Sequence, residues 1–281
     1  MSEEQPNNKQ RQNACIGIFD SGFGGLTVLR AIAERFPNED LLYLGDTARV
    51  PYGTRTPRTV LRYAERCAAH LAREQIKLLV VACNTVSAVA LDDLSLSLDM
   101  PVLGVIHPGA QQAVRQSKQG RIGILATAGT VASGAYVRAV AACSSRAEVF
   151  AEKAPLLVPL VEEGWLEGEL PELAIRRYLE PLVKQDIDTL LLGCTHYPVL
   201  HQSIETQLTK MAGRHLNVID SGAAAAEALF EIMSQRGLQN TKTDKGALRI
   251  HLSDLPGDFE ERLNRFFGKA LQPSSVTQID L

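Results

Sequence analysis

Two cysteines in the sequence have neighbours suited to acid–base chemistry. Cys83 is followed by an asparagine and a threonine, and Cys194 by a threonine and a histidine. A thiol has a reference pKa of about 8.5, so it can give or take a proton near neutral pH. Hydroxyl and amide donors beside it, or a helix N-terminus, stabilise the thiolate. Inverting a carbon that bears a hydrogen needs a base on one face and an acid on the other, which two opposed thiols could supply.

Three other interpretations of these cysteines are compatible with the residue pattern. Both thiols could be small buried hydrophobic groups. They could hold a metal, but Cys194-x-His196 with one distant cysteine is not a standard zinc spacing, so no metal site is predicted. One cysteine could be a covalent nucleophile assisted by His196, although residues two apart on a strand share a face without necessarily meeting. The similar context of the two cysteines favours paired acid–base chemistry.

Each cysteine directly follows a run of apolar residues. The runs are 78–82 and 190–193, and polar residues bound both of them. Apolar runs of this length predict fully buried strands of a parallel sheet. Open α/β sheets bind their ligands beyond the carboxyl ends of the strands. We therefore expect both thiols to face one pocket.

Predicted strands alternate with predicted helices along the chain, which is typical of an α/β fold with parallel sheets. We expect strands at 16–20, 40–45, 78–82, 101–105, 121–125, 190–193, 248–252 and 275–279. Helices are expected at 26–36, 59–74, 85–98, around 136–140, and at 171–184, 222–233 and 259–267, with Asp220 as a helix cap. Segment 106–109 is expected to be an interdomain turn, and segment 155–163 to be irregular.

The order of elements starts twice. A strand, a glycine-containing loop and a helix follow Ile16 and again Ile122, and a cysteine-ended strand follows each at a similar distance. We predict two doubly wound domains related by an internal repeat, with the active site in the cleft between them. The first domain is expected to comprise 14–107 and 217–281, and the second 108–216. Segment 1–13 is polar and is predicted to be a disordered tail.

Composition excludes several classes of protein. The 281 residues carry a net charge of −3 and only 5% aromatics, which disfavours binding to nucleic acid. No apolar run approaches the ~20 residues of a membrane span, and segment 1–13 lacks the apolar region of a signal peptide. The five cysteines include no CxxC, which argues against a disulfide framework and for the cytoplasm. Cys67 lies on the apolar stripe of a helix and is expected in the core.

A glycine-rich loop, Ser21–Gly25, follows the first strand. Its glycines permit close approach of a ligand ahead of a helix N-terminus, which favours anions. A dinucleotide fingerprint is the alternative, but the Gly-x-Gly-Gly spacing lacks the later glycine. We predict no cofactor here.

Four segments, in order and spacing, resemble the glutamate racemases of the cofactor-independent aspartate/glutamate racemase superfamily. They are Asp20-Ser21-Gly22-Phe23-Gly24-Gly25, Pro51-Tyr52-Gly53, Ala82-Cys83-Asn84-Thr85 and Gly193-Cys194-Thr195-His196-Tyr197-Pro198. The similarity extends from Ile16 to about Leu229. It implies interconversion of L- and D-glutamate without cofactor or metal, which supplies D-glutamate for bacterial peptidoglycan.

By this resemblance, Cys83 and Cys194 are the catalytic acid and base. Asp20 assists the first thiol and His196 the second, and Glu162, not the glutamate after it, matches a further catalytic residue. The resemblance also implies contacts to the substrate from Asp20, Ser21, Tyr52, Gly53, Asn84, Thr85, Thr127, Thr130, Thr195 and His196. Simpler roles are a helix cap for Asp20, a structural histidine at His196 and a solvated acid at Glu162.

Two other functions are compatible with these residues. An aspartate racemase, or another superfamily member, would keep the fold and both cysteines. A non-catalytic amino-acid-binding protein would keep the cleft, but binding alone needs no thiol. The expected partners are glutamate as substrate, a cell-wall precursor as activator, as in some bacterial relatives, and a second copy of the chain in a homodimer.

Overall fold

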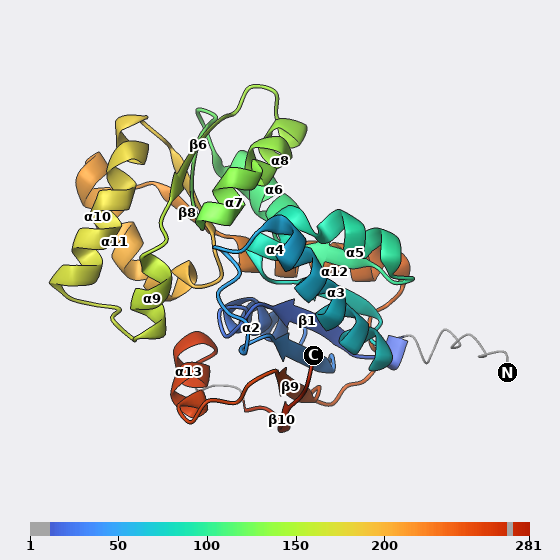
Figure 1. The fold of residues 1–281 in the computed structure, drawn as a ribbon. Coiled ribbons are helices and arrows are strands. Elements are labelled where there is room, and N and C mark those ends of the chain that lie inside the picture. The colour runs from blue at the N-terminus through green and yellow to red at the C-terminus, as the bar shows by residue number, and fades with distance from the viewer. Residues whose placement is uncertain (1–11, 269–271) are drawn as a thin grey trace, which may run out of the picture.

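The computed structural model describes residues 12–268 and 272–281 and contains two parallel β-sheets, each covered by helices (Figure 1). The first sheet has the strand order β10-β9-β2-β1-β3-β4. Its strands are β1 (Ile16–Asp20), β2 (Leu41–Gly45), β3 (Leu78–Val81), β4 (Val102–Gly104), β9 (Leu248–Leu252) and β10 (Ser275–Gln278). The second sheet has the order β6-β5-β7-β8, with β5 (Arg121–Ala126), β6 (Glu148–Lys153), β7 (Thr189–Gly193) and β8 (Asn217–Asp220).

The strand orders confirm the predicted repeat. The series β2-β1-β3-β4 in the first sheet corresponds to β6-β5-β7-β8 in the second, and β9 and β10 extend only the first. Strands β3 and β7 therefore hold equivalent places, and each is followed by one of the two cysteines. All pairings are parallel, so the predicted α/β class is confirmed as well.

Helices cover both faces of each sheet. In the first half they are α2 (Leu26–Arg35), α3 (Pro57–Arg73), α4 (Asn84–Val89), α5 (Leu91–Ser97), α12 (Ser221–Arg236) and α13 (Phe259–Phe266). In the second half they are α6 (Ile106–Gln116), α7 (Ala128–Ser133), α8 (Ala135–Cys143), α9 (Leu157–Glu162), α10 (Glu169–Lys184), the 3-10 helix η1 (Tyr197–Leu200) and α11 (His201–Ala212).

One apolar cluster runs through both halves. It joins the face of the first sheet under α2 and α12 to the face of the second sheet under α9, α10 and α11. The opposite faces have smaller clusters, under α3 in the first half and under α6 and α8 in the second. Cys67 is fully buried in the cluster under α3, as predicted. The shared cluster fixes the two halves against each other.

Two segments expected to lack regular structure are helical. Segment 106–109 is the first turn of α6, and segment 155–163 contains α9. Each helix has its proline, Pro108 or Pro159, in its first turn. A backbone N–H has no partner within the helix there, so proline costs no hydrogen bond. The expected helix at 85–98 is two helices that meet at Ala90, and β6 and α11 were not expected.

The chain was predicted to re-enter the first domain at Asn217, but it does so one strand later, after β8. Strand β8 pairs with β7, with Val218 opposite Leu190, so residues 217–220 belong to the second sheet. Asp220 then caps α12, as expected, because its side chain accepts a hydrogen bond from the N–H of Gly222. The predicted disordered tail lies outside the described residues except for Gln12 and Asn13, which are helical.

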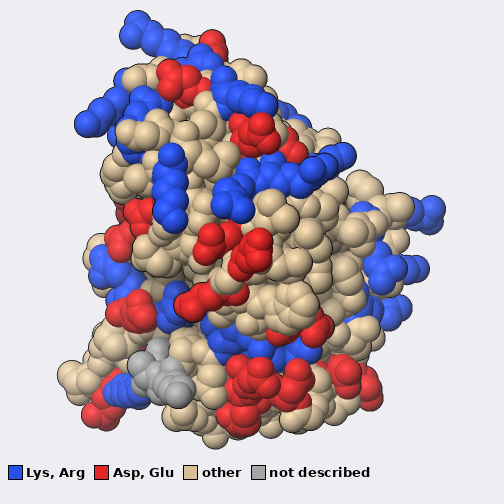
Figure 2. Space-filling model, turned by 90° about the vertical axis from the view of Figure 1, so that its left-hand side faces the viewer, with Lys and Arg blue, Asp and Glu red and all other residues tan. Residues whose placement is uncertain are grey.

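Charges of both signs are interspersed on one face of the molecule. Figure 2 shows the side that carries α10, α11 and α13, where lysines and arginines alternate with acidic residues. A nucleic-acid interface is typically a continuous basic surface, and the face shown does not present one. No helix among the described residues has the length and apolarity needed to cross a membrane.

Candidate active site

Both cysteines lie where the sequence predicted them, at the carboxyl ends of equivalent strands. Cys83 follows β3 and is the N-cap residue of α4, and Cys194 follows β7 just before η1. Each is only 5% exposed. The first turn of α2, which follows β1, contacts a neighbour of the second thiol: the Thr27 hydroxyl donates to the carbonyl of Thr195 at 3.0 Å. The structure therefore brings the ends of β1, β3 and β7 to one buried site.

Cys83 has a hydroxyl and a carboxyl group as its polar surroundings. Its Sγ lies 3.5 Å from the Oγ of Ser21. Asp20 is fully buried; its Oδ2 accepts from the N–H of Gly22 at 2.9 Å, and its Oδ1 has no partner among the described residues. Burial, followed by the charge of Asp20, raises the pKa of the Cys83 thiol to about 12. Burial also raises the pKa of Asp20. Cys83 is therefore a protonated thiol in this state.

Asp20 is not the cap of the following helix. The N-cap residue of α2 is Gly25. A methyl group on Gly25 would come within 2.3 Å of the Cβ of Asp20, and one on Gly24 within 2.5 Å of the Nδ1 of His196. Glycine is thus needed at both positions because the loop packs directly against the side chains of Asp20 and His196.

Cys194 has a different set of partners. Its Sγ lies 3.9 Å from Nδ1 of His196, and Nε2 of His196 lies 2.6 Å from Oε1 of Glu162. Arg262 forms an ion pair with the other oxygen of Glu162, and Arg265 donates to the backbone carbonyl of that residue. The imidazole also meets the ring of Phe266 edge-on at 5.2 Å. A relay of three side chains, His196, Glu162 and Arg262, thus leads away from the second thiol.

The charges in this relay are set by hydrogen bonds rather than by burial. Burial lowers the pKa of His196, but its bonds to Cys194 and Glu162 outweigh this and raise the pKa to about 10. Burial raises the pKa of Glu162, but His196 and Arg262 outweigh it and leave that pKa lowered. Near neutral pH the pair is therefore an imidazolium and a carboxylate. One thiol faces a cation, and the other faces a buried carboxyl group.

Hydroxyl and amide groups from both halves complete the site. The hydroxyls of Thr85, Thr127 and Thr130 lie 3.0 to 3.4 Å from one another. Asn84 accepts from the hydroxyl of Tyr136 at 2.6 Å, and its Nδ2 lies 3.4 Å from the Oγ of Ser221. These neutral donors, like Ser21 and Thr195, are suited to holding carboxylates.

The Pro51–Gly53 loop contributes backbone rather than side chain. Tyr52 is buried, and its hydroxyl donates to the carboxylate of Asp46, so it is already occupied. The carbonyl of Gly53 accepts from the N–H of Gly129 at 3.0 Å. The loop therefore rests on the start of α7 in the other half of the molecule. The bond between Val50 and Pro51 is cis.

Four residues of the site were missed by sequence reasoning: Tyr136, Ser221, Arg262 and Arg265. The two arginines lie on α13, beyond the segment that carries the resemblance. The chain offers no local signal for them, since Arg262 and Glu162 are 100 residues apart. A cavity of about 340 Å³ between α6, β8 and α12 lies apart from the thiols and is lined by residues such as Arg115, Asp220 and Glu231.

The two-domain α/β fold and the paired thiols define an amino-acid racemase, an isomerase. A family model described as Asp/Glu/Hydantoin racemase matches residues 16–229. The chain belongs to this family, as the motifs predicted.

Several relatives resemble the chain over almost their whole length. Glutamate racemase of Aquifex aeolicus is 44% identical over 264 residues, which are 94% of this chain and 98% of the relative. A crystal structure of glutamate racemase from Francisella tularensis in complex with D-glutamate is 31% identical, with a TM-score of 0.87 and coverage of 96% and 98%. The Escherichia coli enzyme in complex with L-glutamate and the activator UDP-MurNAc-ala is 26% identical, with a TM-score of 0.72 and coverage of 95% and 98%.

Proposed function

We propose that this protein interconverts L- and D-glutamate by proton transfer at the α-carbon, with Cys83 and Cys194 acting on opposite faces. The observation that carries the proposal is the pair of buried thiols at equivalent strand ends, each with its own titratable partner. A structural pair of cysteines would need neither Asp20 nor His196 beside it. The names of the relatives that span the chain support glutamate as the substrate.

The two thiols have different charged neighbours. Cys194 lies 3.9 Å from Nδ1 of the His196 imidazolium, and we assign it as the base. Burial and Asp20 keep Cys83 protonated, which makes it the acid. As Cys194 takes the α-proton from one face, Cys83 delivers a proton to the other face. The reverse reaction needs the opposite states, and Asp20 can accept the Cys83 proton on Oδ1, which has no hydrogen-bond partner among the described residues.

The substrate is held by groups that carry no charge of their own. Ser21, Asn84, Thr85, Thr195 and the backbone around Gly53 supply donors to its two carboxylates, and Thr127 and Thr130 extend this set. Because the charge of the carbanion spreads onto the α-carboxylate, donors fixed before reaction stabilise it without reorganising. Arg262 and Arg265 are engaged with Glu162, so they serve the relay behind Cys194.

Single serine variants in deuterated water test the two-thiol scheme. Cys83→Ser and Cys194→Ser should each lose racemisation. In each variant one thiol remains, on one face of the α-carbon, so each variant should still exchange the α-proton of one enantiomer with solvent. The thiol that remains differs, so the two variants should act on opposite enantiomers. NMR of the α-position, with D- and L-glutamate supplied separately, measures both. Racemisation retained by both variants, or exchange of the same enantiomer by both, would refute the scheme. Faster turnover of aspartate than of glutamate would refute the substrate.

The cellular role is proposed on the same basis. We infer that the chain works in the cytoplasm and supplies D-glutamate for peptidoglycan, consistent with its five free cysteines. The similar Escherichia coli enzyme has UDP-MurNAc-ala as an activator, and we propose the same class of effector here. Turnover with and without that compound tests this, and an unchanged rate argues against it.

A homodimer is a further part of the proposal. Large apolar side chains that are about half exposed lie on α10 and just before it, namely Trp165, Leu170 and Leu173. A second copy of the chain could cover them. Light scattering of the wild type and of Trp165→Glu measures the mass, and a monomer at all concentrations would rule the dimer out.

A further inference from the structure

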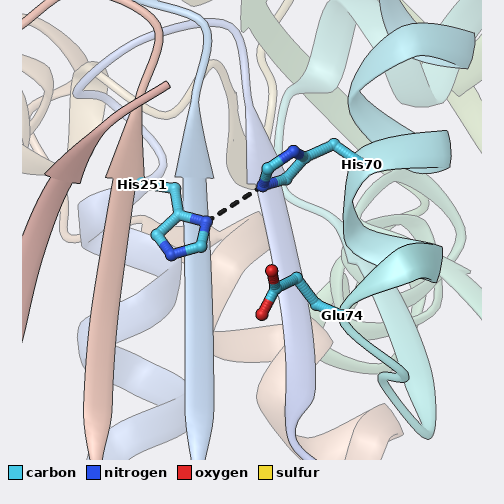
Figure 3. Close-up of side chains that lie close together, drawn as sticks. All are labelled: His70, Glu74 and His251. Atoms are coloured by element: carbon cyan, nitrogen blue, oxygen red, sulfur yellow. Dashed lines mark hydrogen bonds between the residues drawn. The ribbon is translucent and has the colours of Figure 1, made fainter. Parts of the chain in front are cut away.

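A cluster of three metal-ligand side chains lies outside the active site, between α3 and β9. His70 lies near the end of α3, Glu74 is its C-cap residue, and His251 lies on β9 (Figure 3). Their ligand atoms all lie within 4.8 Å of one another. Spacing of four residues places His70 and Glu74 on the same side of the helix, facing the strand. We propose that these three side chains bind one divalent transition-metal ion, with zinc as the representative ion.

The two histidines already hold their nitrogens at nearly the required separation. Nε2 of His70 and Nδ1 of His251 are 3.0 Å apart. Two nitrogens bound at ~2.0–2.1 Å in tetrahedral zinc would lie about 3.3 Å apart, so a small side-chain rotation admits the ion. In the present hydrogen bond one ring shares a proton with the other. Metal binding needs both lone pairs, so that proton moves to the other nitrogen of its own ring and the net charge of the pair stays unchanged.

The third ligand is oriented by a neighbour. Nη1 of Arg249 lies 3.0 Å from Oε2 of Glu74, which leaves Oε1 to turn toward the histidines. Outer partners of this kind fix the geometry of metal ligands. The charge of Arg249 repels any cation and offsets the charge of Glu74, so electrostatic attraction alone would not hold the ion. The affinity must therefore come from the imidazole nitrogens. This favours zinc, cobalt or nickel over magnesium and calcium.

The surroundings suit a metal that keeps a water ligand. His251 is buried, while Glu74 is 31% exposed, so the ion has a route from solvent and room for a fourth ligand. The sequence pattern alone indicated no such site, because residues 70 and 251 meet only in the fold.

The site would clamp a helix to the sheet next to the substrate loop. His251 is two residues before Ser253, whose hydroxyl donates to Asp46 at 2.7 Å. Asp46 in turn accepts from Tyr52 in the Pro51–Gly53 loop. A metal joining α3 to β9 would therefore stabilise the strand that supports this loop, without contact with the reacting atoms.

Cobalt titration of the full chain tests the proposal. Cys83 and Cys194 are first replaced by serine, so that the active-site thiols cannot take the ion, and circular dichroism checks the fold. We expect one equivalent of Co²⁺ with the visible absorption of a four-coordinate ion and no near-ultraviolet thiolate band. His70→Ala should lower the affinity at least a hundredfold, since loss of an outer partner alone commonly costs about 10–100-fold. His215→Ala removes an exposed histidine beside Glu205 and should change nothing.

A second measurement uses the wild type with Zn²⁺ alone. The thermal midpoint should rise with zinc concentration, because an ion that binds only the folded chain stabilises it, and His70→Ala should abolish the rise. Absence of tight cobalt binding by the folded chain would overturn the proposal. So would a thiolate band, or equal binding by His70→Ala. Racemisation enters neither measurement, so failure here is independent of the proposed activity.

Discussion

The relay behind Cys194 gives a quantitative prediction for the substitution Glu162→Gln. Glutamine keeps the size and a hydrogen-bond acceptor for His196, whose Nε2 lies 2.6 Å from Oε1 of Glu162, but it carries no charge. A hydrogen bond to a charged group contributes about 1.5–3 kcal/mol. One pKa unit corresponds to about 1.4 kcal/mol. The pKa of His196, about 10 in the wild type, should therefore fall by about one to two pH units.

The pKa of His196 falls in Glu162→Gln because the carboxylate stabilises the charged form of the imidazole. Glu162 favours the imidazolium, so its loss lets His196 become neutral at lower pH. Cys194 then loses the cation beside it at lower pH too, and the alkaline limb of racemisation should move to lower pH. Because L- and D-glutamate are equal in free energy, kcat/KM must stay equal in the two directions. The effect therefore appears in the pH profile and not as a preference for one enantiomer.

Histidine-labelled protein followed by ¹⁵N NMR reports the titration, and circular dichroism of glutamate solutions reports the pH profile. Glu163→Gln is the matched control, since Glu163 is an exposed neighbour. Arg262→Gln should act in the opposite direction, because it removes a positive charge near the imidazolium. A pH profile of Glu162→Gln equal to that of the wild type, or an equally large shift in Glu163→Gln, would contradict this prediction.

Three further predictions concern the glycine loop next to His196, the hydrogen bond of Thr27 and the pH dependence of stability. Gly24→Ala should abolish racemisation in a folded protein, because its Cβ would lie 2.5 Å from Nδ1 of His196, whereas Gly257→Ala meets nothing within 4 Å and should be fully active. Thr27→Val removes the hydroxyl whose proton is shared by the carbonyls of Gly24, at 2.9 Å, and Thr195, at 3.0 Å, and should cost about 1–3 kcal/mol in urea unfolding; a wild-type midpoint would contradict this. The charge of His196 should stabilise the fold fully below pH 6.5, and this contribution should be lost as pH rises through about 10. Between these pH values the free energy of unfolding should therefore fall more in the wild type than in Glu162→Gln.

The thiols and the sheets were predictable because their signals are local. An apolar run that ends in a cysteine defines a buried strand and the residue at its carboxyl end, and two such runs at Cys83 and Cys194 define a repeat. Helices α6 and α9 were not predictable in this way. Each is preceded by a short link and has a proline in its first turn, a pattern that also favours turns. Strand β6 was not predicted because it lies at the edge of its sheet and none of its residues is buried, so it has no long apolar run.

The charges of the site could not be predicted from the sequence. The raised pKa of Cys83 depends on complete burial beside Asp20, and that of His196 depends on Glu162, which is 34 residues away in the chain. Arg262 comes from a segment with no motif of its own. The first two contacts each form within one half of the molecule, and the contact of Arg262 with Glu162 joins the two halves; no spacing in the chain encodes any of them.

The hydrogen bonds that cross between the halves have a consequence for how the molecule works over time. Thr27 with Thr195, Gly53 with Gly129, and Thr85 with Thr127 join the two halves, and each thiol is only 5% exposed. We expect a ligand the size of an amino acid to reach these buried thiols only when some of these hydrogen bonds break. While these hydrogen bonds are formed, bulk water is excluded and cannot protonate the α-carbanion on either face. The same hydrogen bonds would thus exclude water during the reaction and slow substrate binding and product release.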